Sequence, residues 1–183
     1  MSVFTNSSSS SPEEIAGYVQ AVLGLVGGRE PLEILRTTPG ALEAVAGRFG
    51  PAIRTLEAPG KWSANIVLQH LADSELVFGW RIRLVLAHDR PTLTGYDQDR
   101  WADRLHYADA DPHDAIERFT ILRRSNLRLV ERATPADLAR IAVHTERGEE
   151  SLAHILRLYA GHDVLHLRQL DRILAAVTSS SQG

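Results

Sequence analysis

The chain has 183 residues, of which 44% are hydrophobic and 23% charged, and its formal net charge is -3. This length and composition predict one soluble domain with a sizeable core. Because no run of lysine or arginine stands out, we expect no nucleic-acid partner and no attraction to an anionic membrane. No apolar run is long enough to span a bilayer, and the first residues lack the features of a signal peptide. We therefore expect a cytoplasmic protein.

The absence of cysteine restricts the chemistry further. It excludes disulfides, thiolate metal ligands and a cysteine nucleophile. Any thiol chemistry must therefore use a thiol that a substrate brings.

The first predicted helix begins at a capping box. Ser11-Pro-Glu-Glu14 places a proline at the first helical position, and Gly27-Gly28 ends the helix. Residues 1–30 are thus assigned to a serine-rich segment and an extra N-terminal helix. A second helical region covers about 31–49, where Thr38-Pro39 is either a kink or the true start of the main helix.

The third predicted helix begins after Ser63, a favourable N-cap residue, and ends near His88. It carries His70 on its second turn. The connection that follows, 89–111, shows no sustained hydrophobic period. A connection of this length within a compact domain is often functional.

Two further helices complete the chain. One begins at Asp111-Pro112 and continues to about Arg132, after which Thr134 caps a short helical turn. After a polar segment, Ser151 caps the last helix, which is expected to end near Val177.

No alternating strand pattern competes with these helices. The sequence therefore predicts an all-α four-helix bundle over residues 31–177, followed by a flexible tail over 178–183. The bundle has one long crossover loop between its second and third main helices.

His162 and His166 lie four residues apart in the last predicted helix. Because an α-helix repeats every 3.6 residues, both rings share one face, and the apolar spacing turns that face toward the core. Buried imidazoles need partners for their nitrogens, and a divalent ion shared by several rings supplies them. His70 is the best candidate for a third ligand. On spacing alone, buried histidines that bond backbone carbonyls are an equal alternative.

Asp73 and Asp163 lie close in sequence to these histidines. A carboxylate that accepts a hydrogen bond from a ring N–H orients a metal-binding histidine. We therefore predict that both carboxylates orient ligand rings, with solvated surface charges as the alternative.

Three groups of residues together resemble the DinB/YfiT-like metal-binding four-helix bundle family. They are Lys61-Trp62-Ser63 followed by His70-Leu-Ala-Asp-Ser-Glu75, Tyr96-Asp97 before Trp101, and Ala160-Gly-His-Asp163 with His166 and Gln169. The resemblance covers about 31–177 and leaves the role of the N-terminal helix open. It implies a DinB/YfiT-like bundle and a divalent ion, zinc or nickel, on His70, His162 and His166. It also suggests a homodimer.

His144, Glu146 and Arg147 resemble a family segment near the mouth of the metal site. The resemblance makes them candidates for substrate contact. An ordinary polar loop is the alternative reading.

The resemblance leaves the reaction open. Family members with assigned activities include thiol-dependent S-transferases and a thiol-dependent maleylpyruvate isomerase, while many others carry only the general name of metal-dependent hydrolases. Our leading prediction is an S-transferase in which the metal activates a low-molecular-weight thiol for attack on an electrophilic substrate.

Two alternatives stand beside it. One is a hydrolase that activates water, because His162-Asp-Val-Leu-His166 resembles the H-E-x-x-H motif with aspartate in the place of glutamate. The other is a non-catalytic stress protein whose metal only stabilises the bundle.

Overall fold

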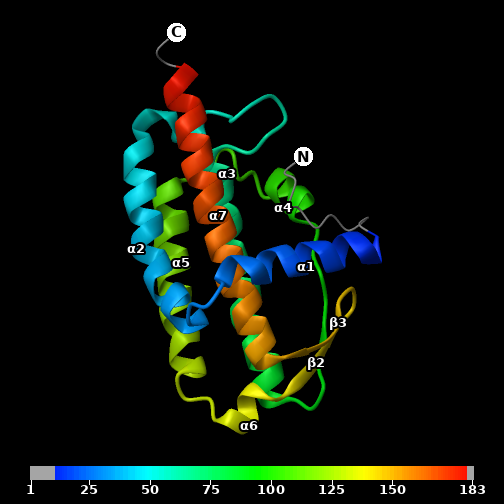
Figure 1. The fold of residues 1–183 in the computed structure, drawn as a ribbon. Helices are drawn as coiled ribbons and strands as arrows, with labels where there is room; N and C mark the ends of the chain where they lie inside the picture. Colours follow the sequence, from blue (N-terminus) through cyan, green and yellow to red (C-terminus); the bar gives the residue numbers. More distant parts are fainter. Residues whose placement is uncertain (1–10, 181–183) are drawn as a thin grey trace.

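The computed structural model describes residues 11–180. Four long helices form the bundle: α2 (Pro31–Phe49), α3 (Ala64–Ala87), α5 (Pro112–Val130) and α7 (Leu152–Ser180). α3 packs on α5, α5 on α2, α2 on α7 and α7 on α3, so the helices close a ring (Figure 1). The predicted four-helix bundle is thereby confirmed.

The extra N-terminal helix, α1 (Pro12–Val26), lies across the bundle and packs against α7 (Figure 1). Its capping box forms as predicted, since the Ser11 hydroxyl oxygen accepts from the N–H of Glu14 and the Glu14 carboxylate accepts from the N–H of Ser11. At the crossing with α7, a Cβ on Gly161 would lie 2.2 Å from the carbonyl oxygen of Val22. Any larger residue at this position would force the two helices apart.

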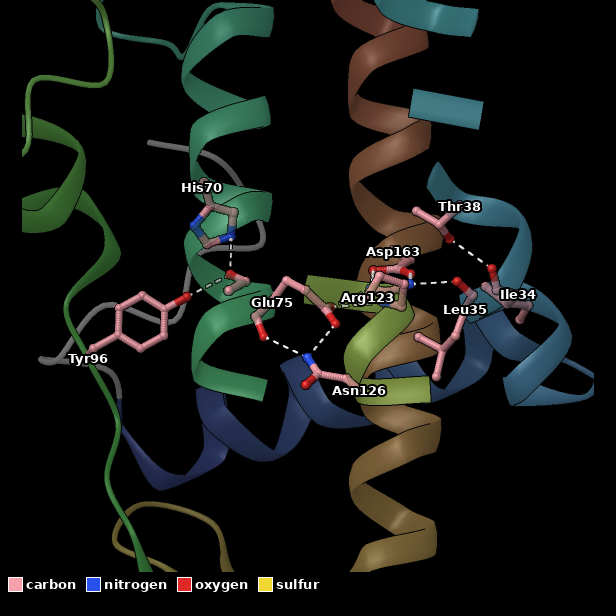
Figure 2. A network of polar contacts seen from close by, with 10 residues as sticks. Ile34, Leu35, Thr38, His70, Glu75, Tyr96, Arg123, Asn126 and Asp163 are labelled. Carbon is pink, nitrogen blue, oxygen red and sulfur yellow. Dashed lines mark hydrogen bonds and ion pairs between the residues drawn. The ribbon is translucent and has the colours of Figure 1, made fainter. Parts of the chain in front are cut away.

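α2 is one continuous helix from Pro31, although Pro39 lies inside it. Proline has no N–H, so the carbonyl four residues earlier, at Leu35, lacks its helical donor. Nη1 of Arg123 on α5 donates to that carbonyl at 2.8 Å (Figure 2). The main helix therefore begins at Pro31 and not at Thr38-Pro39. Pro39 is tolerated inside it because Arg123 satisfies the carbonyl that Pro39 leaves free.

The connections between the long helices hold short elements. They are η1 (Gly50–Arg54), β1 (Thr92–Leu93), α4 (Gln98–Arg104), α6 (Pro135–Leu138), β2 (Ile141–His144) and β3 (Gly148–Ser151). β2 pairs with β1 in parallel and with β3 antiparallel. The sequence showed no pattern for these strands, because strands of two to four residues are too short to show a period of two.

The remaining predicted helix starts agree with the structure. The side chains of Ser63, Asp111, Thr134 and Ser151 each accept a backbone N–H from the first turn that follows. α7 continues beyond the predicted end at Val177 to Ser180. The hydroxyl of Thr178 donates to the carbonyl of Leu174 and so stays within the helix. Of the predicted tail, 181–183 lie outside the described residues, as do 1–10 of the serine-rich segment.

Two apolar clusters fill the bundle, one reaching Leu138 of α6 and the other reaching Ile53 of η1. Polar side chains lie between them on all four helices. They are Thr38, Glu75, Arg123, Asn126, His166 and Gln169, and all are buried. Among residues 11–180, the structure contains no helix that is both long and apolar enough to cross a membrane.

Candidate metal centre

Three histidine rings meet at this polar layer, His70 from α3 and His162 and His166 from α7. Nε2 of His162 lies 3.2 Å from Nε2 of His70 and 3.1 Å from Nε2 of His166. Nitrogen ligands on a tetrahedral zinc ion lie roughly 3.3 Å apart, since each bond measures about 2.0–2.1 Å. The structure thus brings together the three histidines predicted as ligands, in a geometry that fits a divalent ion.

Gln169 holds the ring of His166 from the other side. Its amide oxygen lies 2.7 Å from Nδ1 of His166. Because an amide oxygen only accepts, Nδ1 carries the proton in the neutral ring, which leaves a lone pair on Nε2. That lone pair points to where the three rings meet, as a metal ligand requires.

Burial keeps the three rings neutral. It lowers the pKa of His70 and of His162 well below the usual value, and nearby ring charges lower both further. Burial also lowers the pKa of His166 to about 4, although the hydrogen bond that His166 donates to Gln169 and the charge of Asp163 act in the opposite direction. Neutral imidazole is the form that binds a metal ion.

The carboxylates predicted to orient the rings have other partners. Oδ2 of Asp163 lies 2.6 Å from Nη1 of Arg123, and Oδ1 lies 3.1 Å from Nη2. Asp73 accepts from the hydroxyl of Tyr107 at 2.6 Å. The prediction for both was therefore wrong. Successive residues of a helix are rotated by about 100°, which turns Asp163 away from the face of His162.

Arg123 links two buried carboxylates, Glu75 of α3 and Asp163 of α7 (Figure 2). Its Nε donates to Glu75 at 2.9 Å, and the other oxygen of Glu75 accepts from Asn126 at 2.7 Å. Burial raises the pKa of Glu75, although Arg123 acts in the opposite direction. Although burial favours the neutral guanidine, Asp163 and Glu75 raise the pKa of Arg123. Arg123 therefore stays charged and fixes α5 to α3 and α7.

A cavity of about 100 Å³ opens beside the histidines. His70 and His162 line it together with Ser74 and Arg81 of α3, Tyr159 and Leu158 of α7, and residues of the two connections. Tyr18, Val19 and Val22 of α1 form one wall, so the extra helix borders the candidate centre. Burial raises the pKa of Tyr18 to about 12, so this hydroxyl keeps its proton at neutral pH.

The residues predicted to contact substrate separate into two groups. Arg147 and Glu146 line the cavity, and the guanidinium of Arg147 pairs with Glu150 at 2.5 Å. His144 is buried, and its Nε2 lies 3.2 Å from Nη2 of Arg81. Burial, together with the charges of Arg147 and Arg81, lowers the pKa of His144 to about 3. For His144 the prediction needs correction, because its ring supports Arg81 and is not itself among the residues that line the cavity.

The sequence reading missed Arg81 and Gln98, which both line the cavity. A signal for Arg81 was present, since it follows His70 by eleven residues, close to three helical turns, and so shares its face. Gln98 carried no such signal, because its position depends on how the connection folds back over α3.

Comparison with known proteins agrees with this fold. The DinB superfamily matches residues 20–170 of the chain. The solved structure of YfiT from Bacillus subtilis, described as having an unusual four-helix bundle topology, superposes with a TM-score of 0.69 at 22% identity, and the match covers 92% of each chain.

Two sequence relatives carry the name of metal-dependent hydrolase with the qualifier "putative". One, from Oceanobacillus iheyensis, is 27% identical over 111 residues, which cover 61% of this chain and 64% of that protein. The other is YfiT, 26% identical over 146 residues, which cover 77% of this chain and 82% of YfiT. The chain thus spans just under two thirds of the length of the first relative.

Proposed function

Because this chain belongs to the DinB superfamily, we propose that it is a metal-dependent enzyme whose divalent ion, zinc or nickel, is held by His70, His162 and His166. The observation that carries the proposal is the meeting of three neutral rings, Nε2 to Nε2, at the side of a cavity. The relatives' name of metal-dependent hydrolase supports the metal and leaves the reaction open.

The reaction that we propose is S-transfer from a low-molecular-weight thiol to an electrophile. Bound to three neutral imidazoles, a divalent ion keeps its positive charge and lowers the pKa of a thiol that it binds. The chain contains no cysteine, so the thiol comes from a cosubstrate. In the transfer the thiol sulfur forms a new bond to carbon, the leaving group departs with its electron pair, and the thiol proton passes to solvent.

The position of Asp163 argues against hydrolysis of the H-E-x-x-H kind. In the H-E-x-x-H arrangement the acidic residue acts as a base on water. Here both oxygens of Asp163 accept from Arg123, and the side chain is buried. A thiol with a lowered pKa needs no such base, because it loses its proton to solvent at neutral pH.

The test uses metal-loaded protein with a panel of low-molecular-weight thiols and monobromobimane as the electrophile. We expect conjugation that falls when a chelator removes the metal, and a sulfur-to-metal charge-transfer band when a thiol is added to the nickel or cobalt form. His166→Ala should abolish metal binding and conjugation but retain most helicity, because burial of the apolar clusters supplies most of the folding free energy.

His154→Ala is the matched control. His154 lies on α7 and is absent from the cavity lining, so metal binding and conjugation should be unchanged. If no thiol gives either a band or metal-dependent conjugation, S-transfer is refuted.

A second candidate function is hydrolysis, and Glu146 is the observation that favours it. Its carboxylate lies in the cavity lining against Gly95, and in this alternative it would take a proton from water. Under this alternative, Glu146→Gln should lower metal-dependent cleavage of p-nitrophenyl acetate by roughly 100-fold. Under S-transfer the same variant should leave thiol conjugation within a few-fold of the wild-type rate.

A further inference from the structure

Arg81 is a buried cation whose partners are all neutral. It is 6% exposed, and it donates to the hydroxyl of Tyr159 at 3.0 Å and to the carbonyl of Thr94 at 2.6 Å. Its third contact is the ring of His144, which its low pKa keeps neutral. Within residues 11–180, no ion pair joins Arg81 to a carboxylate, whereas the other buried arginine, Arg123, pairs with two.

A buried charge without a counter-charge costs free energy, which a bound anion would recover. The hydrogen bonds to Tyr159 and Thr94 use two of the five N–H groups of the guanidinium. Since Arg81 lines the cavity, the remaining donors can reach a molecule that enters it.

Gln98 supplies a second donor without a partner. Its Nε2 is buried and donates to no acceptor in the described part of the chain. Gln98 lines the same cavity as Arg81. A buried amide N–H₂ group that faces a cavity calls for an acceptor, and a carboxylate oxygen is a strong one.

Part of the remaining wall is apolar, beside polar residues that include Ser74, Glu146 and Arg147. Val19 and Val22 of α1 and Leu158 of α7 line the cavity, which measures about 100 Å³. This volume is several times the roughly 10–15 Å³ that one water requires. The cavity therefore suits a small molecule with one anionic end and a short apolar part.

We infer that Arg81 and Gln98 form a subsite for the carboxylate of a small organic substrate, beside His70 and His162. That this carboxylate belongs to the electrophile rests on the proposed function. The binding of a carboxylate at Arg81 does not rest on the proposed function, because it needs only the cavity and the N–H donors of Arg81 and Gln98.

The test is the binding of butanoate, followed by calorimetry and ligand-observed NMR, to the full-length protein before and after chelator treatment. Butanamide, with the same shape and no charge, is the neutral comparison, and propylphosphonate is the alternative anion. Butanoate should bind at least 10-fold more tightly than butanamide, and the binding should persist after chelation.

The variants locate the binding. Arg81→Gln and Gln98→Leu should each weaken butanoate affinity, Arg81→Gln by 10-fold or more and Gln98→Leu by a few-fold. Arg83→Gln, an exposed arginine of the same helix that is absent from the cavity lining, should leave it unchanged. Circular dichroism checks that Arg81→Gln folds, and Gln98→Leu tests the subsite independently if it does not.

Three results would overturn the inference. They are equal binding of butanoate and butanamide, loss of butanoate binding on chelation, and wild-type affinity in the folded variants. If propylphosphonate binds more tightly than butanoate and Arg81→Gln weakens that binding, the subsite recognises a tetrahedral anion and not a carboxylate. None of these results depends on conjugation activity. The binding experiments therefore test the subsite, and the conjugation assay tests S-transfer, independently of each other.

Discussion

The hydrogen bond between Gln169 and Nδ1 of His166 directs the lone pair of Nε2 toward the neighbouring rings. Gln169 lies three residues after His166, on the same face of α7, and is buried. The residue that orients a ligand ring is therefore an amide, and Asp163, adjacent to His162, serves a different purpose.

Gln169→Leu should weaken metal affinity by about 10- to 100-fold, because Nδ1 of His166 loses its acceptor and the ring loses its fixed orientation. Competition against a chromogenic chelator measures the affinity. Arg168→Leu, at the preceding position and outside the cluster, is the control and should bind metal as the wild type does. Equal affinities in the two variants would refute the role of Gln169.

Arg123→Met should destabilise the protein by about 3–5 kcal/mol, because it leaves Glu75 and Asp163 buried without their cation. It also removes the donor to the Leu35 carbonyl. Chemical denaturation measures the free energy of unfolding. Arg36→Met breaks the half-exposed pair with Glu131 and should cost less than about 1 kcal/mol. Similar losses in both variants would contradict a structural role for the buried pair.

At the level of elements, α1 is positioned by its contact with α7. Its Tyr18, Val19 and Val22 form a wall of the cavity, and Val22 packs directly against Gly161. Gly161 immediately precedes His162. The residue that lets α1 approach α7 is thus adjacent to a predicted metal ligand, so α1 docking and cavity shape are linked.

Gly161→Ala should push α1 away from α7, because the added methyl would overlap the carbonyl of Val22. We expect a destabilisation of about 1–3 kcal/mol and faster hydrogen exchange in α1 than in the bundle. Gly17→Ala, on the exposed side of α1 with no atom within 4 Å of the new Cβ, should be neutral or slightly stabilising. Unchanged exchange in α1 of Gly161→Ala would contradict the close approach.

Across the whole molecule, the polar layer between the two apolar clusters makes stability depend on pH. Four histidines, His70, His144, His162 and His166, are held neutral by burial. An unfolded histidine takes up a proton near pH 6.5, but these take one up only at lower pH in the folded protein. Between these values the unfolded chain binds more protons, so the free energy of unfolding falls as the pH falls.

Metal-free protein should therefore lose stability from about pH 6.5 down toward pH 4, by roughly 1 kcal/mol per pH unit for each such histidine. The raised pKa of Glu75 has the opposite effect on the free energy of unfolding, but Glu75 is a single group and there are four such histidines. Denaturant unfolding at a series of pH values with chelator present measures the slope. His166→Ala should reduce it, and His154→Ala should not.

Metal should reverse part of this loss. At about 100 times its dissociation constant, an ion that binds only the folded protein stabilises by roughly 3 kcal/mol at neutral pH, and protons compete with it as the pH falls. A flat stability profile without metal would contradict the burial of neutral rings.

Local chemistry made the helices and the histidine pair readable from sequence. Ser11, Ser63 and Ser151 marked helix starts because a cap is a contact within one turn. His162 and His166 share a face because of the helical repeat alone. His70 was the best candidate for a third ligand on its helix, the resemblance supported it, and the structure places its ring against the other two.

Tertiary structure decided which residues of distant segments contact one another. Arg123 meets Asp163, Glu75 and the Leu35 carbonyl only because α5, α7, α3 and α2 surround one layer, and no local spacing encodes that meeting. The short sheet likewise depends on pairing between connections far apart in sequence. The chain alone thus determined its helices and a pair of candidate ligands, since these follow from the backbone repeat. Packing decided which buried charges are paired and which face the cavity, because Coulomb and hydrogen-bond partners are set by distance in space.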